Sequence, residues 1–156
     1  MFSILLSFLL SVGDGYIAAY PSQSRQAIET FDSCRPELEK ILPGATEEEL
    51  RIIFSIVAPE VSCYNSLTDY FETSAVKKEY PAKGTPDYSI GLFQMKPGFV
   101  ETLENAVAND KALKAKYGSR ITYDSNNLVD KRRERVNRLS STRWQLFYLA
   151  VFVDIV

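Results

Sequence analysis

Residues 144–153, near the end of the chain, are apolar at every position except Gln145. The stretch is much shorter than the roughly 20 residues that a membrane-spanning helix needs. A helix that is apolar on all sides is stable in water only when other elements cover it. The segment therefore predicts a helix buried in the core of a globular domain.

A capped amphipathic helix is predicted to begin at Thr46. Thr46 and Glu49 have the spacing of a capping box. The apolar residues that follow recur at helical spacing: Leu50, Ile53, Phe54 and Val57. Pro59 has no backbone N–H to donate and is expected to end or kink the helix. This places Glu60 at or just past a helix C-terminus, where the negative end of the helix dipole disfavours a charged carboxylate.

Proline spacing and apolar periodicity predict the remaining elements. Residues 20–44 contain three prolines and predict an extended lead-in with a short helix at residues 26–31. Residues 65–88 predict a short helix followed by an irregular loop, and residues 99–117 predict a helix that Gly118 ends. The alternation typical of strands is scarce, so the predicted fold class is mainly α.

Composition limits the chemistry that the chain can perform. Its 156 residues make one domain. It contains no histidine, which excludes Ser-His-Asp and Cys-His nucleophilic systems and the commonest zinc ligand. Hydrolytic chemistry must therefore rest on carboxylates, and neither a metal nor another cofactor is expected. The formal net charge of -2 gives no reason to expect nucleic acid as a partner, so the basic residues 131–138 are interpreted as a solvated helix face.

The chain begins with an apolar run at residues 1–12, of the length found in the core of secretory signals. Small residues follow at Gly13 and Gly15, which predicts a signal peptide over residues 1–15 and a mature chain beginning near Tyr16. The protein is then expected in the periplasm or cell envelope of a bacterium, with no stable membrane span after signal removal. No basic residue precedes the run, so a buried N-terminal helix and a wrongly assigned start codon remain alternatives.

The predicted domain organisation places an N-terminal lead-in at residues 16–45 and the folded domain at residues 46–156. The chain stops within an apolar segment that has no C-cap, which is the pattern of a truncated gene product. Cys34 and Cys63 could form one disulfide in an oxidising compartment or remain two thiols.

The segment Ser89-Ile90-Gly91-Leu92-Phe93-Gln94-Met95-Lys96-Pro97 carries a family resemblance. It resembles the Gly-Leu-Met-Gln motif of lytic transglycosylases and goose-type lysozymes, with Phe93 in place of the methionine and Lys96 in place of an apolar residue. In that family the motif follows a catalytic glutamate at the end of a helix, and Glu60 has that position. The resemblance spans residues 46–97 and implies a lysozyme-like helical domain with a glycan-binding cleft.

The resemblance implies cleavage of the β-1,4 bond between N-acetylmuramic acid and N-acetylglucosamine in peptidoglycan. A carboxylic acid must protonate the leaving oxygen, and apolar neighbours such as Val57, Val61 and Phe93 would help Glu60 to keep its proton. In a lytic transglycosylase one glutamate suffices, because the substrate's N-acetyl group assists and its C6 hydroxyl attacks, which leaves a 1,6-anhydro end.

Other residues are candidate substrate contacts. Gly91 would let the backbone approach a sugar or adopt a positive φ, and Gln94 could bond a sugar or its own loop. Lys96 could contact a peptide-stem carboxylate or remain solvated. Four aromatic residues are candidate cleft walls or core residues: Tyr64, Tyr70, Tyr88 and Phe93.

Three departures from the family leave alternatives open. Val61 follows Glu60 where many transglycosylases have serine, the gap from Glu60 to Gly91 is longer than usual in the family, and no Ala-Tyr-Asn motif occurs later in the chain. A lysozyme-like hydrolase would need a second carboxylate, for which Glu72 is the first candidate, ahead of Asp69 and Asp87. A non-catalytic peptidoglycan-binding domain is the remaining alternative.

Overall fold

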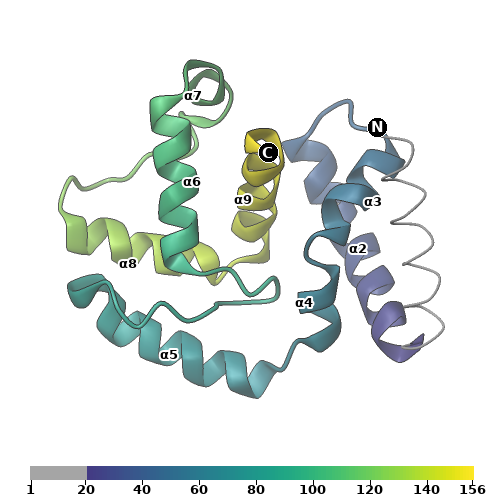
Figure 1. The fold of residues 1–156 in the computed structure, drawn as a ribbon, viewed down its shortest axis with the longest axis horizontal. Helices are drawn as coiled ribbons and strands as arrows, with labels where there is room; N and C mark the ends of the chain where they lie inside the picture. Colours follow the sequence, from purple (N-terminus) through teal and green to yellow (C-terminus); the bar gives the residue numbers. More distant parts are fainter. Residues whose placement is uncertain (1–20) are drawn as a thin grey trace.

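The computed structural model describes residues 21–156, and this part of the chain is mainly helical, as the sequence predicts (Figure 1). The signal peptide expected at residues 1–15, and the expected start near Tyr16, lie outside the described residues. The helices, in order, are α2 (Pro21–Ile41), α3 (Glu47–Ser55), α4 (Ala58–Cys63), α5 (Ser66–Lys83), α6 (Pro97–Asn109), α7 (Lys111–Tyr117), α8 (Leu128–Leu139) and α9 (Thr142–Ile155).

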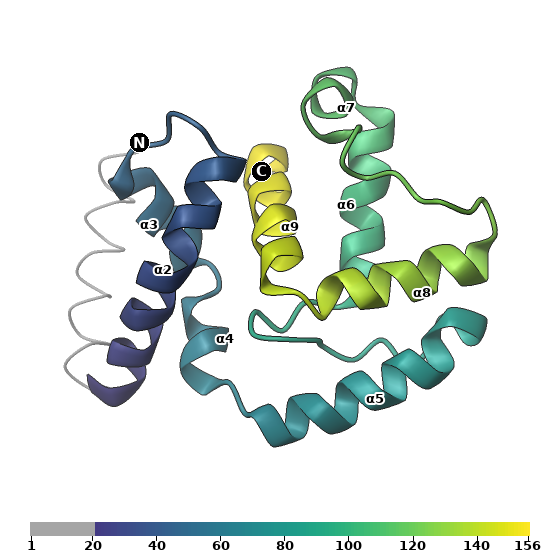
Figure 2. The same ribbon diagram turned by 180° about the vertical axis from the view of Figure 1, so that it is seen from behind.

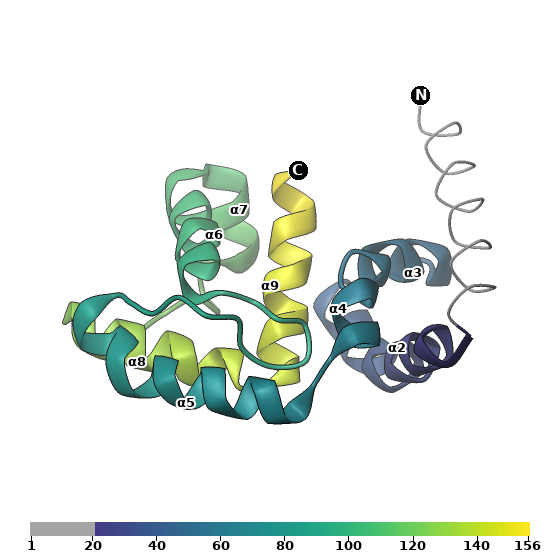
Figure 3. The same cartoon turned by 60° about the horizontal axis from the view of Figure 1, so that its bottom comes forward.

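Helix α9 forms the centre of the core, as its apolar sequence predicts. Every residue from 145 to 151 is buried. The helix contacts α2 and α3 on one side and α6, α7 and α8 on the other (Figure 2). Viewed from below, α9 stands between these two groups of helices, and α5 runs beneath the second group (Figure 3). The position of α9 therefore determines how the two halves of the molecule meet.

The expected extended lead-in is instead a continuous helix, α2, which includes Pro36. The buried residues Phe31, Cys34, Leu38 and Ile41 recur at helical spacing along one face. Packing of this face against α3, α4 and α9 outweighs the hydrogen bond that a proline removes from a helix. The prediction of a short helix at residues 26–31 was therefore wrong in length.

Helix α3 begins as predicted, because Thr46 and Glu49 form a reciprocal capping box. Two other predicted boundaries were wrong. Helix α5 is longer than expected and accommodates Pro81 before Gly84 ends it at φ +74°. The helix expected over residues 99–117 is divided at Asp110, whose side chain accepts a hydrogen bond from the Leu113 amide and so starts α7.

Helix α8 is only partly the solvated face that the sequence predicts. Arg135 and Arg138 are buried, with exposed fractions of 4% and 7%. Arg135 donates two hydrogen bonds to Glu104 on α6, at 3.0 and 2.8 Å. The other oxygen of Glu104 accepts from the hydroxyls of Tyr123 and Tyr148, at 2.5 and 2.7 Å. This buried cluster joins α6, α8, α9 and the segment between α7 and α8.

The two cysteines are free in the structure, with Cys34 buried and Cys63 exposed. Burial raises the pKa of the Cys34 thiol above its ordinary value.

Removal of the Glu104 carboxylate should destabilise the protein strongly. Glu104→Ala leaves Arg135 buried without its main partner, which is expected to lower the free energy of unfolding by about 3–5 kcal/mol. Urea unfolding measures the change. Glu101→Ala is the matched control, because Glu101 pairs with the same arginine at 3.2 Å but its side chain is 36% exposed. A loss below about 1 kcal/mol is expected for the control, and equal losses would contradict the assignment.

Alkaline pH should destabilise the fold through Tyr117. Burial, followed by the hydrogen bond to Asp154, raises the pKa of Tyr117 from 10.0 to about 12. The neutral phenol is favoured in the folded state, so its contribution is complete below pH 10 and is lost as the pH rises to about 12. Unfolding measured between these pH values should lose less stability in Tyr117→Phe than in the wild type, and an equal loss would exclude this role.

Candidate functional site

Residues 91–94 of the family-like segment form a tight turn. Ile90 and Met95 pair on either side of it through two backbone hydrogen bonds of 3.0 and 3.2 Å. Gly91 has a φ of +73°, which confirms the positive φ expected for this residue. Gln94 also has a positive φ, of +49°, which is uncommon for a residue with a side chain. Such a conformation persists only where surrounding contacts hold it.

The side chain of Gln145 supports the turn from the core. Gln145 is fully buried in α9. Its Oε1 atom accepts a hydrogen bond from the Phe93 amide at 2.9 Å. Its Nε2 group donates to the carbonyls of Ile90 at 2.6 Å and Leu139 at 2.8 Å. A Cβ atom on Gly91 would collide with this amide, so glycine is required there for packing against Gln145.

The carboxylate of Asp69 also supports the turn. Its Oδ1 atom accepts a hydrogen bond from the Gly91 amide at 2.6 Å. The Gln94 Nε2 group lies 3.4 Å from the same oxygen and donates a shorter bond, of 2.8 Å, to the Gly91 carbonyl. The side-chain nitrogen of Gln94 therefore donates to the backbone of its own loop, which was one of the two roles expected for this residue.

Glu60 and Gln94 line the same cleft, which has a volume of about 480 Å³. Phe93 also lines it, although its ring is almost fully buried and packs edge-on against Phe54, with ring centres 5.8 Å apart. The structure thus brings Glu60 together with Gln94 and Phe93. The other lining residues are Ile56, Val57, Ser89, Met95, Lys96, Phe99, Leu149 and Phe152.

Four other predicted contacts do not line this cleft: Gly91, Tyr64, Tyr88 and Tyr70. Tyr64 is half-buried, and its hydroxyl donates to Asp69 at 3.1 Å. Burial, followed by this hydrogen bond, raises the pKa of Tyr64. Tyr88 and Tyr70 are exposed, with fractions of 48% and 66%.

The helix position expected for Glu60 was wrong. The helical break precedes Pro59, which is in the first turn of α4, and Glu60 is in that same first turn. Proline is well tolerated there because the first amides of a helix have no partner within it. Glu60 is also exposed. Its location is therefore at the positive end of a short helix, so the argument from a helix C-terminus does not apply.

The three carboxylates considered as partners for Glu60 are outside the cleft lining. Asp69 holds the turn, and Asp87 accepts a hydrogen bond at 2.8 Å from the Gly98 amide in the first turn of α6. Glu72 is part of α5 and is not a lining residue. Among the described residues that line the cleft, Glu60 is the only acid and Lys96 the only base.

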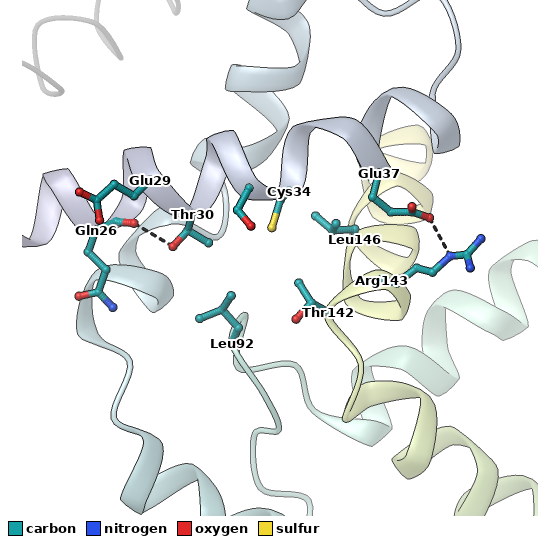
Figure 4. Close-up of a pocket in the computed structure, with 10 residues that line it drawn as sticks. Gln26, Glu29, Thr30, Cys34, Glu37, Leu92, Thr142, Arg143 and Leu146 are labelled. Carbon is teal, nitrogen blue, oxygen red and sulfur yellow. Dashed lines mark hydrogen bonds and ion pairs between the residues drawn. The ribbon is translucent and has the colours of Figure 1, made fainter.

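A larger cavity, of about 550 Å³, lies between α2 and the start of α9 (Figure 4). Glu37 of α2 and Arg143 of α9 form an ion pair of 2.7 Å at one end of it. Leu92, from the same turn as Gln94, points into the cavity. The turn therefore contributes residues to two separate cavities.

Sequence reasoning missed Gln145 and Phe152 as parts of the site. Gln145 carried a signal, because it is the single polar residue in an apolar segment and a buried amide must find partners. Phe152 carried none, because its apolar character is the same as that of its buried neighbours. The role of Asp69 in the turn also depends on a contact between residues 22 positions apart, which local patterns do not show.

The described residues contain no group of three or more Cys, Asp or Glu side chains placed to hold a metal ion. Within the same part of the chain, no helix combines the length and apolar character needed to cross a bilayer.

Gly91→Ala should disrupt the turn. The added methyl group meets the Gln145 amide and also requires a left-handed backbone. Gly44→Ala is the matched control, because Gly44 has a φ of +93° but open space around its Cβ position. Both variants should lose about 1–2 kcal/mol of stability from the backbone. Gly91→Ala should lose roughly 1–3 kcal/mol more in urea unfolding, because it overpacks the core; equal losses would show that the contact with Gln145 is unimportant.

No protein-family model matches the chain, and no curated protein and no solved structure matches it either. The resemblance of residues 89–97 to the lytic transglycosylase motif therefore stays a prediction from sequence.

Proposed function

We propose that the protein is a lytic transglycosylase that cleaves peptidoglycan between N-acetylmuramic acid and N-acetylglucosamine. The observation that carries the proposal is the shared cleft of Glu60 and Gln94, since the family motif requires its glutamate and glutamine to act on one substrate. These residues are 34 positions apart in the sequence, and the fold nevertheless places both on one surface depression.

The composition of the cleft favours a lyase over a hydrolase. Glycoside hydrolases commonly use two carboxylates, one as acid and the other as nucleophile or base. Glu60 is the only acid among the described lining residues, and Glu72 is not one of them. The transglycosylase reaction needs only one carboxyl group, because the nucleophile is the substrate's own C6 hydroxyl.

Glu60 would act first as the acid and then as the base. It donates its proton to the glycosidic oxygen as that bond breaks, while the N-acetyl carbonyl supports the positive charge that develops at C1. The resulting carboxylate then accepts the proton of the C6 hydroxyl as its oxygen bonds to C1. The products are a 1,6-anhydro-muramic acid end and a free hydroxyl on N-acetylglucosamine, with no water consumed.

The other lining residues suit a glycan. The Oε1 atom of Gln94 accepts no hydrogen bond from the described part of the chain, so it is available to a sugar hydroxyl or N-acetyl N–H. Phe99 and Phe152 pack edge to face, with ring centres 5.6 Å apart, and give the cleft an aromatic wall. Lys96 is exposed and can attract a carboxylate of the peptide stem.

Substrate binding is also expected to prepare Glu60. The free carboxyl group is exposed to water. A glycan strand in the cleft would cover it and exclude water from it, beside the apolar lining residues Val57, Phe93 and Phe99.

Digestion of purified peptidoglycan tests the proposal. Wild-type protein should release products with 1,6-anhydro ends, identified by mass spectrometry. Glu60→Gln keeps the shape of the side chain but removes the acid, so its rate should fall by at least about 100-fold. Glu72→Gln is the matched control and should retain the wild-type rate.

Other products would select the alternatives. Reducing ends from the wild type would identify a lysozyme-like hydrolase. Retention on peptidoglycan without release of any product, unchanged by Glu60→Gln, would identify a non-catalytic binding domain. Either result would overturn the proposed lyase activity.

A further inference from the structure

The carboxylate of Asp69 contacts both halves of the candidate site. Its Oδ1 atom accepts from the Gly91 amide at 2.6 Å, at the start of the turn that carries Gln94. Its Oδ2 atom accepts from the Tyr64 hydroxyl at 3.1 Å. Tyr64 is the C-cap residue of α4, the short helix that carries Glu60. One carboxylate therefore links the helix of the candidate acid to the turn of the candidate substrate-binding residue.

Other donors also lie near the Asp69 carboxylate. The Gln94 amide and the Thr73 hydroxyl each lie 3.4 Å from Oδ1, in addition to the short bond from Gly91. Hydrogen bonds to an ionised group are stronger than those between neutral groups. Asp69 does not line the cleft that holds Glu60, so it is placed to orient the site rather than to touch substrate.

We propose that Asp69 is a positioning residue that fixes the turn at residues 91–94 relative to α4, and so sets the placement of Gln94 with respect to Glu60. The catalytic part of this inference rests on the proposed function. The structural part does not, because the hydrogen bond to Gly91 can be measured without any substrate. One carboxylate oxygen of Asp69 then holds the turn through Gly91, and the other contacts Tyr64 at the end of α4.

Three variants separate the contributions. Asp69→Ala removes both bonds. Asp69→Asn keeps an oxygen that can accept from Gly91 but removes the negative charge. Tyr64→Phe removes only the contact with α4. Glu72→Ala is the matched control, because Glu72 is on the same helix and its carboxylate accepts no hydrogen bond within the described residues.

Amide hydrogen exchange, measured by NMR on the full chain, tests whether Asp69 holds the Gly91 amide. The Gly91 amide should exchange at least about tenfold faster in Asp69→Ala than in the wild type, because it loses a charge-assisted bond. Asp69→Asn should restore part of the protection, and Tyr64→Phe and Glu72→Ala should leave it unchanged. Unchanged protection in a folded Asp69→Ala protein would overturn the inference.

Turnover of solubilised glycan strands tests whether Asp69 positions the site for catalysis. In Asp69→Ala, kcat should fall by about tenfold or more with a much smaller change in KM, and Asp69→Asn should recover part of the loss. Tyr64→Phe should lower kcat while Gly91 stays protected. An unchanged kcat in Asp69→Ala, or an equal loss in Glu72→Ala, would overturn the positioning role.

The titration of Tyr64 gives an independent readout. Removal of Asp69 should lower the pKa of Tyr64 toward its ordinary value, because a hydrogen bond to a carboxylate is lost. If the wild type itself releases no product, the proposed function fails and catalytic positioning fails with it. The Gly91 exchange and the Tyr64 titration then still decide whether Asp69 joins the turn to α4.

Discussion

The buried amide of Gln145 is the interaction on which the candidate site depends. It is the single polar residue of the apolar stretch 144–153, near the start of α9, and it bonds three backbone groups from two other segments. A buried amide without partners destabilises a protein by several kcal/mol at most, but one with all its partners specifies a single arrangement. The core helix therefore determines the conformation of the turn as well as the packing of the fold.

This arrangement divides the site into a rigid part and an exposed part. Gln145 bonds the Phe93 amide and Asp69 bonds the Gly91 amide, so two side chains hold the turn in which Gln94 has a positive φ. Glu60, in contrast, is on a short helix and is open to solvent. If the proposed function holds, substrate would cover Glu60, while the turn would present a preformed surface to that substrate.

Patterns within one element were predicted well from the sequence. The capping box at Thr46 and the apolar helix at residues 144–153 both depend on neighbours in the chain. Helix lengths were less predictable where tertiary packing outweighed proline, as at Pro36. Pro59 was interpreted as the end of one helix but is in the first turn of the next, since proline suits both positions.

The residues of the candidate site were also predictable only in part. Glu60, Gln94 and Phe93 were selected by a motif and do share a cleft, whereas aromatic residues chosen by type alone did not. Tyr64 and Asp69 hold each other instead, a contact that depends on the junction between α4 and α5. The burial of Arg135 was missed because its partner, Glu104, lies on another helix, 31 residues earlier in the chain.

The residues that support the turn are synthesised at different times. Asp69 precedes the turn in the chain, but Leu139 and Gln145 follow it by more than 40 residues. A nascent chain that has been synthesised only as far as α8 contains Asp69 but not Gln145. It can therefore form the bond from the Gly91 amide to Asp69 but not the bonds to Gln145. The complete set of contacts around the turn would then form only when α9 has been added.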